Sequence, residues 1–212
     1  MARRRRHRDG CGIAHAADIL GERWALVVIR ELLLGPKRFT DLRSGIPDIS
    51  PNVLGQRLRS LEESGIVQRR KLPAPAASQV YELTDWGSEL EPAVLALGRW
   101  ASRSKALPRP GEMGADSMVL AMKASFDPAA AGDLEATYAL SLDDRPFTVD
   151  VANGRLSARR GETPHHDALI RSDPNTLAAI VFGGRSLTSA KRAGEIEVQG
   201  SARAVGRLLR AL

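Results

Sequence analysis

Three polar side chains recur at helical spacing in the segment ISPNVLGQRLRSLEESG, residues 49–65. Asn52, Gln56 and Arg59 are four and three residues apart, so in a helix they share one face while the leucines of the segment share the opposite one. In a DNA major groove, amide side chains suit adenine and guanidinium groups suit guanine. The spacing therefore fits a helix that reads base edges. Taken alone, it is also typical of an ordinary solvated surface helix.

The ends of this helix are marked in the sequence. Ser50 can cap the first turn, Pro51 fits the first helical position, and Gly65 suits a left-handed stop. Arg57 lies nearer the leucine face than the other polar residues and is the candidate for a phosphate contact. The apolar face is made by Leu54, Leu58 and Leu61.

The segments before this helix decide between the two interpretations. Residues 15–21 and 24–34 are predicted to be helical, and a third short helix is expected at 39–44, followed by a turn. A helix, a tight turn and a helix with a polar outer face form a helix-turn-helix, in which the first helix braces the second in the groove. Arg38 and Thr40, at the start of the bracing helix, are further candidates for DNA contacts.

A basic pair of strands follows the helix. Residues 66–72 and 79–83 are short strand-like runs, and the prolines between them favour an extended loop. A two-stranded wing beside a recognition helix can hold the flanking phosphates. A charge run of this kind is otherwise a solvated sheet edge. The cations of the first strand are Arg69, Arg70 and Lys71.

The positive charge of the chain lies in its first half. Residues 1–105 hold 18 of the 31 basic and 12 of the 25 acidic side chains, which accounts for the whole net charge of +6. A basic half joined to a neutral half indicates that only the first meets a polyanion. At the N-terminus, Arg4 and Arg5 belong to an arginine arm, residues 1–10, that we expect to be disordered. It could lie along phosphates or in a minor groove, or be a tail without a partner.

An apolar stripe follows the wing. Thr84 is predicted to cap one helix whose apolar residues recur every three or four positions, which suits packing on a partner helix. Dimers are expected where a helix-turn-helix reads two half-sites, although the stripe could simply close its own domain. The stripe consists of Trp86, Leu90, Val94, Leu97 and Ala101.

Composition limits the class of protein. No apolar run is long enough for a transmembrane helix, no apolar segment follows the first arginines as in a signal peptide, and the single cysteine excludes an internal disulfide. We expect a cytoplasmic, nucleoid-associated protein. Its expected domains are 11–101 and 118–212, joined by a linker at 102–117 that is rich in proline and glycine.

The first of these domains resembles a known family. Cys11, the stretch ADILGERWALVVIRELLLGPKRFTDLRSGIPDISPNVLGQRLRSLEESGIV and the later YELTDWG resemble the HxlR-type winged-helix transcription regulators of bacteria, in the MarR-like group. The resemblance implies a homodimer that binds double-stranded DNA through a recognition helix at 50–64. It also places Cys11 where some members sense oxidants or electrophiles. That role needs an accessible thiolate, which Arg8 and His15 could favour; the alternative is a packing residue at the dimer junction.

The second half has the pattern of an α+β domain. Strands are predicted at 136–142, 145–152, 155–160 and 168–172, with an Asn-Gly hairpin signal before the third. Two helices at 174–182 and 187–193, a strand at 195–199 and a helix at 202–212 complete it. The N-terminal domain is therefore expected to be mainly α, and the C-terminal domain to be a mostly antiparallel sheet covered by helices.

Residues 118–212 resemble the sterol-carrier-like domain of the type 2 sterol carrier protein group. The resemblance rests on the order of elements, the ANG turn and the segment SDPNTLAAIVFGGRSLTSAKRAGEIEVQGSARAVGRLL. It implies an apolar tunnel for a fatty-acyl or sterol-like ligand, although the same side chains could simply fill a core. The candidate lining is Leu140, Phe147, Val149, Leu156, Leu177, Ile180, Val181, Phe182 and Leu187.

No constellation of acid, base and nucleophile is present in the sequence, so we predict that the protein is not an enzyme. His165 and His166 lack a third ligand at metal spacing, and we expect no metal and no cofactor. The sequence predicts a homodimeric, sequence-specific DNA-binding transcription regulator, with an apolar small molecule as a possible effector. The alternatives are a lipid or apolar-metabolite carrier with a nucleic-acid tether, and a regulator that senses redox state through Cys11.

Overall fold

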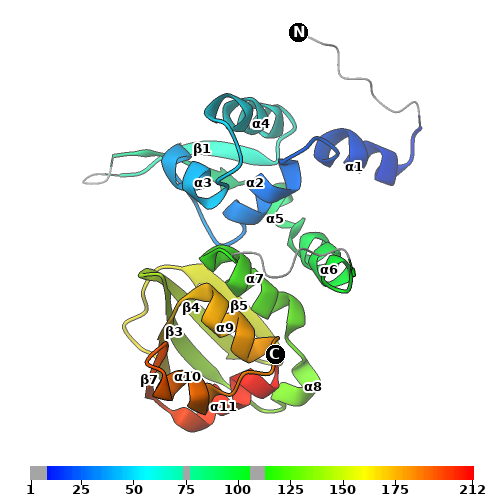
Figure 1. Ribbon diagram of the computed structural model, residues 1–212. Coiled ribbons are helices and arrows are strands. Elements are labelled where there is room, and N and C mark those ends of the chain that lie inside the picture. Colours follow the sequence, from blue (N-terminus) through cyan, green and yellow to red (C-terminus); the bar gives the residue numbers. More distant parts are fainter. Residues whose placement is uncertain (1–8, 74–76, 106–112) are drawn as a thin grey trace. The chain divides into compact units, whose positions relative to one another are not determined.

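The computed structural model of the protein describes residues 9–73, 77–105 and 113–212 (Figure 1). The chain forms two compact units, Met1–Val94 and Leu95–Leu212. The division falls inside a helix, Glu91–Ser102, whereas the sequence predicted a linker at 102–117; residues 106–112 of that linker lie outside the described residues. In the part of the chain that is described, no helix has both the length and the apolar character needed to cross a bilayer.

The N-terminal unit is a helix-turn-helix followed by a two-stranded sheet, as expected. Its core is made of apolar residues from the α2, α3 and α4 helices and from the start of β1, with Val28, Leu42, Leu54 and Leu58 fully buried. The elements are α1 (Gly12–Leu20), α2 (Ala25–Leu32), α3 (Phe39–Gly45), α4 (Pro51–Glu63), β1 (Val67–Lys71), β2 (Gln79–Leu83), α5 (Asp85–Ser88) and the first residues of α6 (Glu91–Ser102).

The predicted ends of α4 are confirmed. The Ser50 Oγ accepts a hydrogen bond from the Val53 backbone N–H at 3.3 Å, and Pro51 occupies the first turn, where no N–H is needed. Gly65 has a φ of 73°, the left-handed conformation that ends a helix and favours glycine. These local signals place α4 directly before the first strand of the wing.

A short third segment joins the two-stranded sheet. β1 and β2 pair antiparallel, with Val67 opposite Leu83 and Lys71 opposite Gln79. Lys37, in the connection between α2 and α3, forms a bridge with Tyr81 on the other edge of β2. The wing is therefore attached to the helix-turn-helix through the backbone as well as through side chains.

The helix expected after Thr84 is two helices. The Thr84 Oγ1 accepts a hydrogen bond from the Gly87 N–H at 3.0 Å and caps α5, which ends at Ser88. α6 then begins at Glu91, with Pro92 in its first turn. Proline lacks the N–H that a continuous helix would need at this position, so the chain starts a new helix here.

The C-terminal unit is an α+β domain, as expected, built on a five-stranded sheet. The strand order is β5-β4-β3-β6-β7, and β3 runs parallel to β6 while the other neighbours pair antiparallel, so the sheet is mixed. The elements are α7 (Ala115–Ser125), α8 (Pro128–Ala131), β3 (Ala136–Leu142), β4 (Arg145–Ala152), β5 (Arg155–Arg160), β6 (Ala168–Ser172), α9 (Pro174–Val181), α10 (Leu187–Arg192), β7 (Ile196–Gly200) and α11 (Ala202–Arg210).

The first four strands of this sheet begin and end at the predicted residues. Asn153 and Gly154 have φ values of 52° and 67°, as a two-residue hairpin turn with positive φ requires, and Asp143 and Asp144 make a second such turn. α7 was not expected, because the proline- and glycine-rich stretch before it extended the predicted linker over its first residues. Figure 1 shows α7 and α9 on the same side of the sheet.

Candidate nucleic-acid interface

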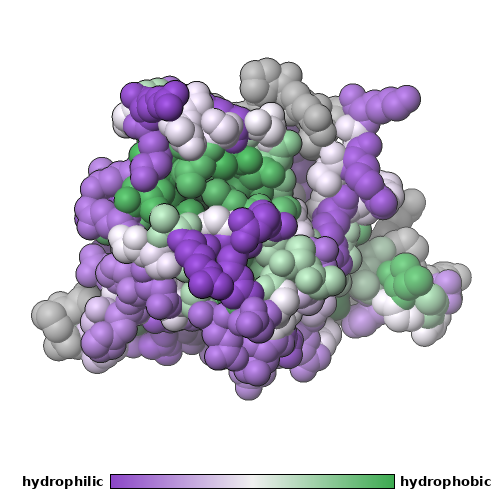
Figure 2. All heavy atoms as spheres, turned by 90° about the horizontal axis from the view of Figure 1, so that it is seen from below, coloured by the Kyte–Doolittle hydropathy of each residue, from purple (hydrophilic) through white to green (hydrophobic). Residues whose placement is uncertain are grey.

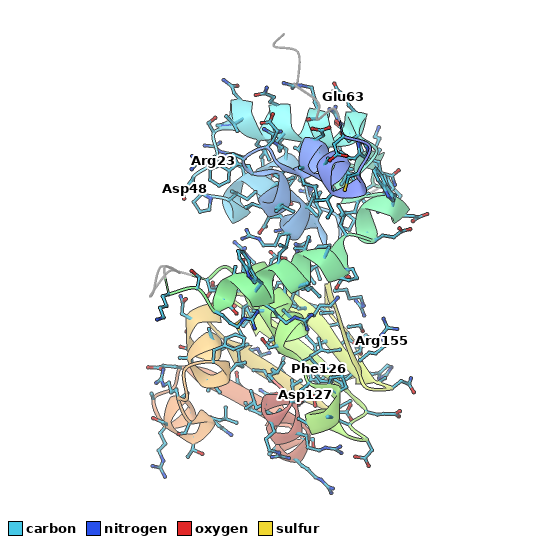
Figure 3. The ribbon with its side chains drawn as sticks, turned by 90° about the vertical axis from the view of Figure 1, so that its right-hand side faces the viewer. Arg23, Asp48, Glu63, Phe126, Asp127 and Arg155 are labelled. Atoms are coloured by element: carbon cyan, nitrogen blue, oxygen red, sulfur yellow. The ribbon has the colours of Figure 1, made fainter. Side chains whose placement is uncertain are left out.

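The predicted base-reading side chains are exposed together on α4. Asn52, Gln56 and Arg59 are all exposed, while the leucines on the opposite face are at most 1% exposed. Glu63 is also exposed and lies four residues after Arg59, so it extends the same face toward the end of the helix (Figure 3). A glutamate can accept a hydrogen bond from cytosine. We did not include Glu63 in the sequence prediction, although its spacing could have identified it.

Arg57 is not placed for the predicted phosphate contact. Arg57 as a whole is only 7% exposed, and its Nη2 donates a hydrogen bond to the Glu22 Oε2 at 3.0 Å. The prediction is corrected on this point, because a buried guanidinium bound to a carboxylate within its own unit cannot also bind a DNA phosphate. Arg57 instead joins α4 to the turn that precedes α2.

The wing cations are partly neutralised by carboxylates. Arg69 forms a forked pair with Glu62 of α4, with the Nε and Nη2 each 2.8 Å from a carboxylate oxygen, and this hydrogen bonding raises the pKa of Arg69. Arg70 donates from its Nε to both oxygens of Glu82, at 2.9 and 2.8 Å. Lys71 is exposed. The basic run therefore carries less free charge than the sequence suggested.

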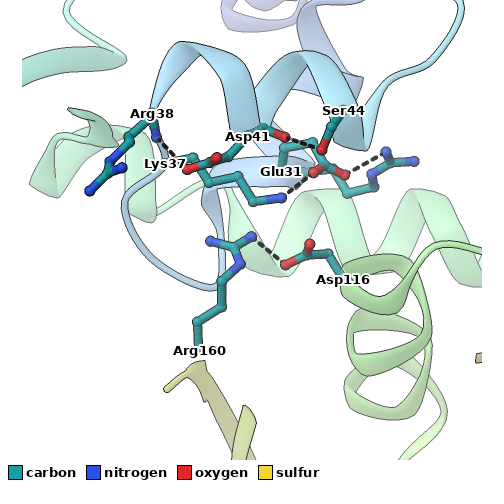
Figure 4. A network of polar contacts seen from close by, with 8 residues as sticks. Glu31, Lys37, Arg38, Asp41, Ser44, Asp116 and Arg160 are labelled. Carbon is teal, nitrogen blue, oxygen red and sulfur yellow. Dashed lines mark hydrogen bonds and ion pairs between the residues drawn. The ribbon is translucent and has the colours of Figure 1, made fainter. Parts of the chain in front are cut away.

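The other predicted DNA contacts surround the start of α3. Arg38 is exposed, and its Nε donates to the Ser78 Oγ at 3.0 Å, which links α3 to the wing. Its backbone N–H donates to the Asp41 carboxylate at 3.2 Å (Figure 4). Thr40 and Ser50 are exposed as well. Arg4 and Arg5 lie outside the described residues.

The apolar stripe is divided by the structure. Leu90 and Val94 pack against the core of the N-terminal unit, whereas Ala101 is half-buried. Trp86 and Leu97 are about half exposed, at 49% and 48%. Two large apolar residues outside the predicted stripe are more exposed, Trp100 of α6 at 68% and Ile13 of α1 at 81%. The predicted stripe thus includes neither of the two most exposed large apolar residues, Ile13 and Trp100.

Cys11 is exposed immediately before α1. The backbone N–H groups of Ile13 and Ala14, in the first turn of α1, lower the pKa of its thiol. Arg8, one of the charged side chains that the sequence suggested, lies outside the described residues. Within the described residues, the thiolate is favoured by the backbone amides at the beginning of a helix.

The predicted ligand-pocket residues of the C-terminal unit fall into two groups. The first group is fully packed, with exposures of 1–8%, and leaves no room for a ligand at those side chains: Leu140, Phe147, Val149, Leu156 and Leu177. These five belong to the buried core of the unit in this structure. Ile180, Val181 and Leu187 are half-buried, and Phe182 is 45% exposed. Figure 2 shows a broad hydrophobic area on the face of the molecule turned toward the viewer.

His165 and His166 are exposed in the connection between β5 and β6. Among the described residues, no three histidine, cysteine, aspartate or glutamate side chains are grouped so that they could hold a metal ion.

The N-terminal half matches a known family. Residues 19–107 match the sequence model of the HxlR-like helix-turn-helix family. A relative from Bacillus subtilis, the uncharacterized HTH-type transcriptional regulator YvaP, is 37% identical over 87 residues, which are 41% of this chain and 81% of the relative. The chain belongs to the HxlR-like helix-turn-helix family. This membership assigns its N-terminal unit to the helix-turn-helix transcriptional regulators.

Other HxlR-like relatives include proteins of known structure. The HTH-type transcriptional regulator YodB of Bacillus subtilis is 38% identical over 88 residues, which are 42% of this chain and 79% of YodB. The structure of quinone-bound YodB covers 43% of this chain and 97% of that chain at 34% identity, with a TM-score of 0.38. The redox regulator HypR in its oxidized form covers 46% of this chain and 100% of that chain at 31% identity, with a TM-score of 0.42.

The C-terminal half matches a different family. Residues 111–212 match the sequence model described as alkyl sulfatase C-terminal. This match covers the whole of the α+β domain. The expected sterol-carrier-like family is not the one that this comparison returns, so the sterol-carrier resemblance stays a prediction.

Proposed function

We propose that the protein is a sequence-specific transcription regulator that binds operator DNA as a homodimer, with α4 in the major groove. The observation that carries the proposal is the exposed row of Asn52, Gln56 and Arg59 on a helix whose other face is fully packed. Amide and guanidinium groups at this spacing can read two or three neighbouring base pairs. Lys71 and the exposed Arg38, on either side of that row in the chain, would supply phosphate contacts.

The proposed homodimer uses the exposed apolar residues of α1, α5 and α6. Trp86, Leu97 and Trp100 leave large apolar surfaces in water, which is unfavourable unless a partner covers them. Dimers of helix-turn-helix proteins place two recognition helices one turn of DNA apart, so a palindromic operator is expected. In this arrangement the regulator acts at the chromosome, in the cytoplasm.

The C-terminal unit is proposed to hold an apolar or amphipathic small molecule that changes operator affinity. The support is the partly exposed group Ile180, Val181, Phe182 and Leu187, which is what remains of the expected tunnel lining. Such a ligand regulates only if it binds the DNA-competent dimer and the other forms with different affinity. We also propose that this unit is a sterol-carrier-like binding domain and that it has no enzymatic activity.

Redox control through Cys11 is a second candidate. It is favoured by the exposure of the thiol and by its lowered pKa. Both are properties that an oxidant- or electrophile-sensing cysteine requires. The relatives YodB and HypR have structures described as quinone-bound and oxidized, respectively.

The proposal is tested by comparing specific with non-specific DNA. A duplex is first selected in vitro from random sequences by the wild-type protein. The Gln56→Ala/Arg59→Ala variant should then lose affinity for this duplex by about 10²-fold or more, since each good base contact is worth ~1–3 kcal/mol, while its affinity for random DNA changes little. Equal losses on both kinds of DNA would remove α4 as the reading element. Arg210→Ala, in the exposed part of α11, is the matched control and should leave both affinities unchanged.

The effector is tested separately on the full-length protein. Native mass spectrometry of the purified protein would show whether a small molecule is retained, and a thermal-shift panel of fatty acids, alkyl sulfates and sterols would show which class stabilises it. A Phe182→Asp variant should lose any stabilisation that the wild type gains. No retained mass together with no thermal shift across the panel would reject the effector but leave the DNA-binding proposal intact.

A further inference from the structure

Lys37 takes part in two interactions that join different parts of the N-terminal unit. Its backbone N–H donates to the Tyr81 carbonyl at 3.0 Å, and the Tyr81 N–H donates to the Lys37 carbonyl at 2.8 Å, which fixes this residue to the outer edge of β2. Its Nζ donates to Glu31 of α2 (Figure 4). The side chain therefore points back into the helix-turn-helix while the backbone belongs to the wing.

Glu31 is the buried partner in this interaction. Its side chain is 2% exposed and that of Lys37 is 7% exposed. The Glu31 Oε1 also accepts a hydrogen bond from Arg30 at 2.7 Å. Glu31 lies in the last turn of α2, the helix that contacts α4, and its two partners come from α2 and from the connection to α3.

Gly45, the last residue of α3, lies directly on this pair. A Cβ at Gly45 would overlap the Glu31 Oε2 and would lie 3.4 Å from the Lys37 Nζ. A side chain at this position would have to displace the Glu31 carboxylate from its place beside Lys37. α2, the end of α3 and the edge of β2 therefore meet at one buried ion pair.

A buried ion pair adds little net stability. The cost of removing two charges from water offsets most of their attraction, and replacing such a pair by apolar side chains of similar volume is often neutral or stabilising. The pair does impose a direction, because the Nζ must stay within hydrogen-bonding distance of one carboxylate oxygen. Position, rather than stability, is therefore what this pair can supply.

We propose that the Glu31–Lys37 pair is the joint that fixes the wing relative to the recognition helix, so that Lys37 is a positioning residue for operator binding. This inference rests on the proposed operator recognition. A second contact, from Arg38 at the start of α3 to Ser78 at the loop end of the wing, follows Lys37 by one residue and also joins the wing to the helix-turn-helix. Without the joint, the wing phosphate contacts and the α4 base contacts no longer fit one duplex at the same time.

The test replaces the pair by apolar side chains in the full-length protein. The Glu31→Leu/Lys37→Met variant should unfold at the same temperature as the wild type or a higher one, while its affinity for the selected duplex falls about tenfold, equal to ~1.4 kcal/mol. In the absence of DNA, backbone amide hydrogen exchange at Tyr81 and at position 37 should be about tenfold faster in this variant than in the wild type. The Arg171→Gln/Glu197→Gln variant breaks an exposed ion pair of the C-terminal sheet and should change none of these values.

The outcomes separate this inference from the proposed function. Unchanged operator affinity in the Glu31→Leu/Lys37→Met variant, or its failure to fold, would overturn the positioning role, because the pair would then be neutral or needed for the fold. If the wild type selected no sequence from random DNA, the proposed function would fail. The exchange measurement would still test whether the Glu31–Lys37 pair fixes the wing. Unchanged exchange in the double variant would overturn that role, and faster exchange at equal thermal stability would support it. The single Lys37→Met variant should unfold at a lower temperature than the wild type, since it leaves Glu31 buried without its lysine; unchanged stability would count against the buried pair.

Discussion

Arg57 of α4 and Glu22 of the turn before α2 are joined by a hydrogen bond of 3.0 Å between the Nη2 and the Oε2. The Arg57 side chain is 9% exposed and that of Glu22 is 49% exposed, so the pair lies at the edge of the core. It connects the recognition helix to the segment that leads from α1 into α2. Two arginines of the same helix thus have different roles, since Arg59 is exposed on the opposite side.

The first prediction separates these two arginines. Arg57→Ala should lower the free energy of unfolding by about 1–3 kcal/mol, because it removes a hydrogen bond to a charged group together with the packing of a buried side chain. Arg59→Ala should leave stability nearly unchanged and lower affinity for the selected duplex. Urea unfolding and fluorescence anisotropy measure the two quantities. A stable Arg57→Ala protein that binds all DNA more weakly would return Arg57 to the phosphate contacts.

The second prediction concerns Gly55, in the middle of the recognition helix. A Cβ at this position would meet only the Arg59 Nη1, at an ordinary contact distance of 3.6 Å. Gly55→Ala should therefore raise the free energy of unfolding by up to ~1 kcal/mol, the usual gain for alanine over glycine in a helix. We expect operator affinity to fall about tenfold, ~1.4 kcal/mol, because the methyl group keeps the helix from the DNA. Unchanged affinity would show that the glycine has no part in binding.

The third prediction is the pH dependence of Cys11. Because the helix amides lower the pKa of the thiol, the rate of alkylation by iodoacetamide should reach half its maximum at a lower pH than in an unstructured cysteine peptide. The same interaction of the thiolate with the backbone amides stabilises α1 above the ordinary thiol pKa, and this contribution is lost as the pH falls through the lowered pKa. Cys11→Ser is the control and should not react. Identical profiles for protein and peptide would contradict the lowered pKa.

The fourth prediction tests the proposed dimer. Leu97→Asp/Trp100→Asp places two charges on the exposed apolar side of α6 and should convert the dimer to a monomer in native mass spectrometry at micromolar concentration. Phe182→Asp removes an exposed apolar side chain from the C-terminal unit and is the matched control; it should remain dimeric. A dimer that persisted in the α6 variant would place the interface elsewhere.

The segments with strong local signals could be predicted from the sequence. The strands Gln79–Leu83 and Arg145–Ala152 begin and end where their apolar patterns and turn residues place them, and Ser50 and Gly65 mark the ends of α4. Such signals act between residues a few positions apart, so they survive in the sequence alone. Pro92 also marks the break between α5 and α6 in the sequence. The regular apolar spacing across this position nevertheless predicted one continuous helix.

The interactions between distant residues could not be predicted in the same way. The partner of Arg57 is 35 residues away, and the Arg38–Ser78 contact spans 40 residues. A charge count treats Arg69 and Arg70 as free cations, because Glu62 and Glu82 meet them only when the wing folds against α4 and on itself. Likewise, Leu140 and Phe147 are apolar side chains that could line a tunnel or fill a core, and only the folded structure shows that they are buried in the core.

The sequence by itself determined the ends of α4, the bounds of the first four strands of the C-terminal sheet and the family to be expected. These depend on periodicity and on residues such as Ser50, Pro51 and Gly65, whose backbone preferences are local. Only the tertiary structure decided which charged side chains are available to DNA and which hold the unit together. The physical reason is that burial and ion pairing depend on distances between segments, and the approach of Gly45 to Glu31 and Lys37 exists only after α2, α3 and β2 have packed.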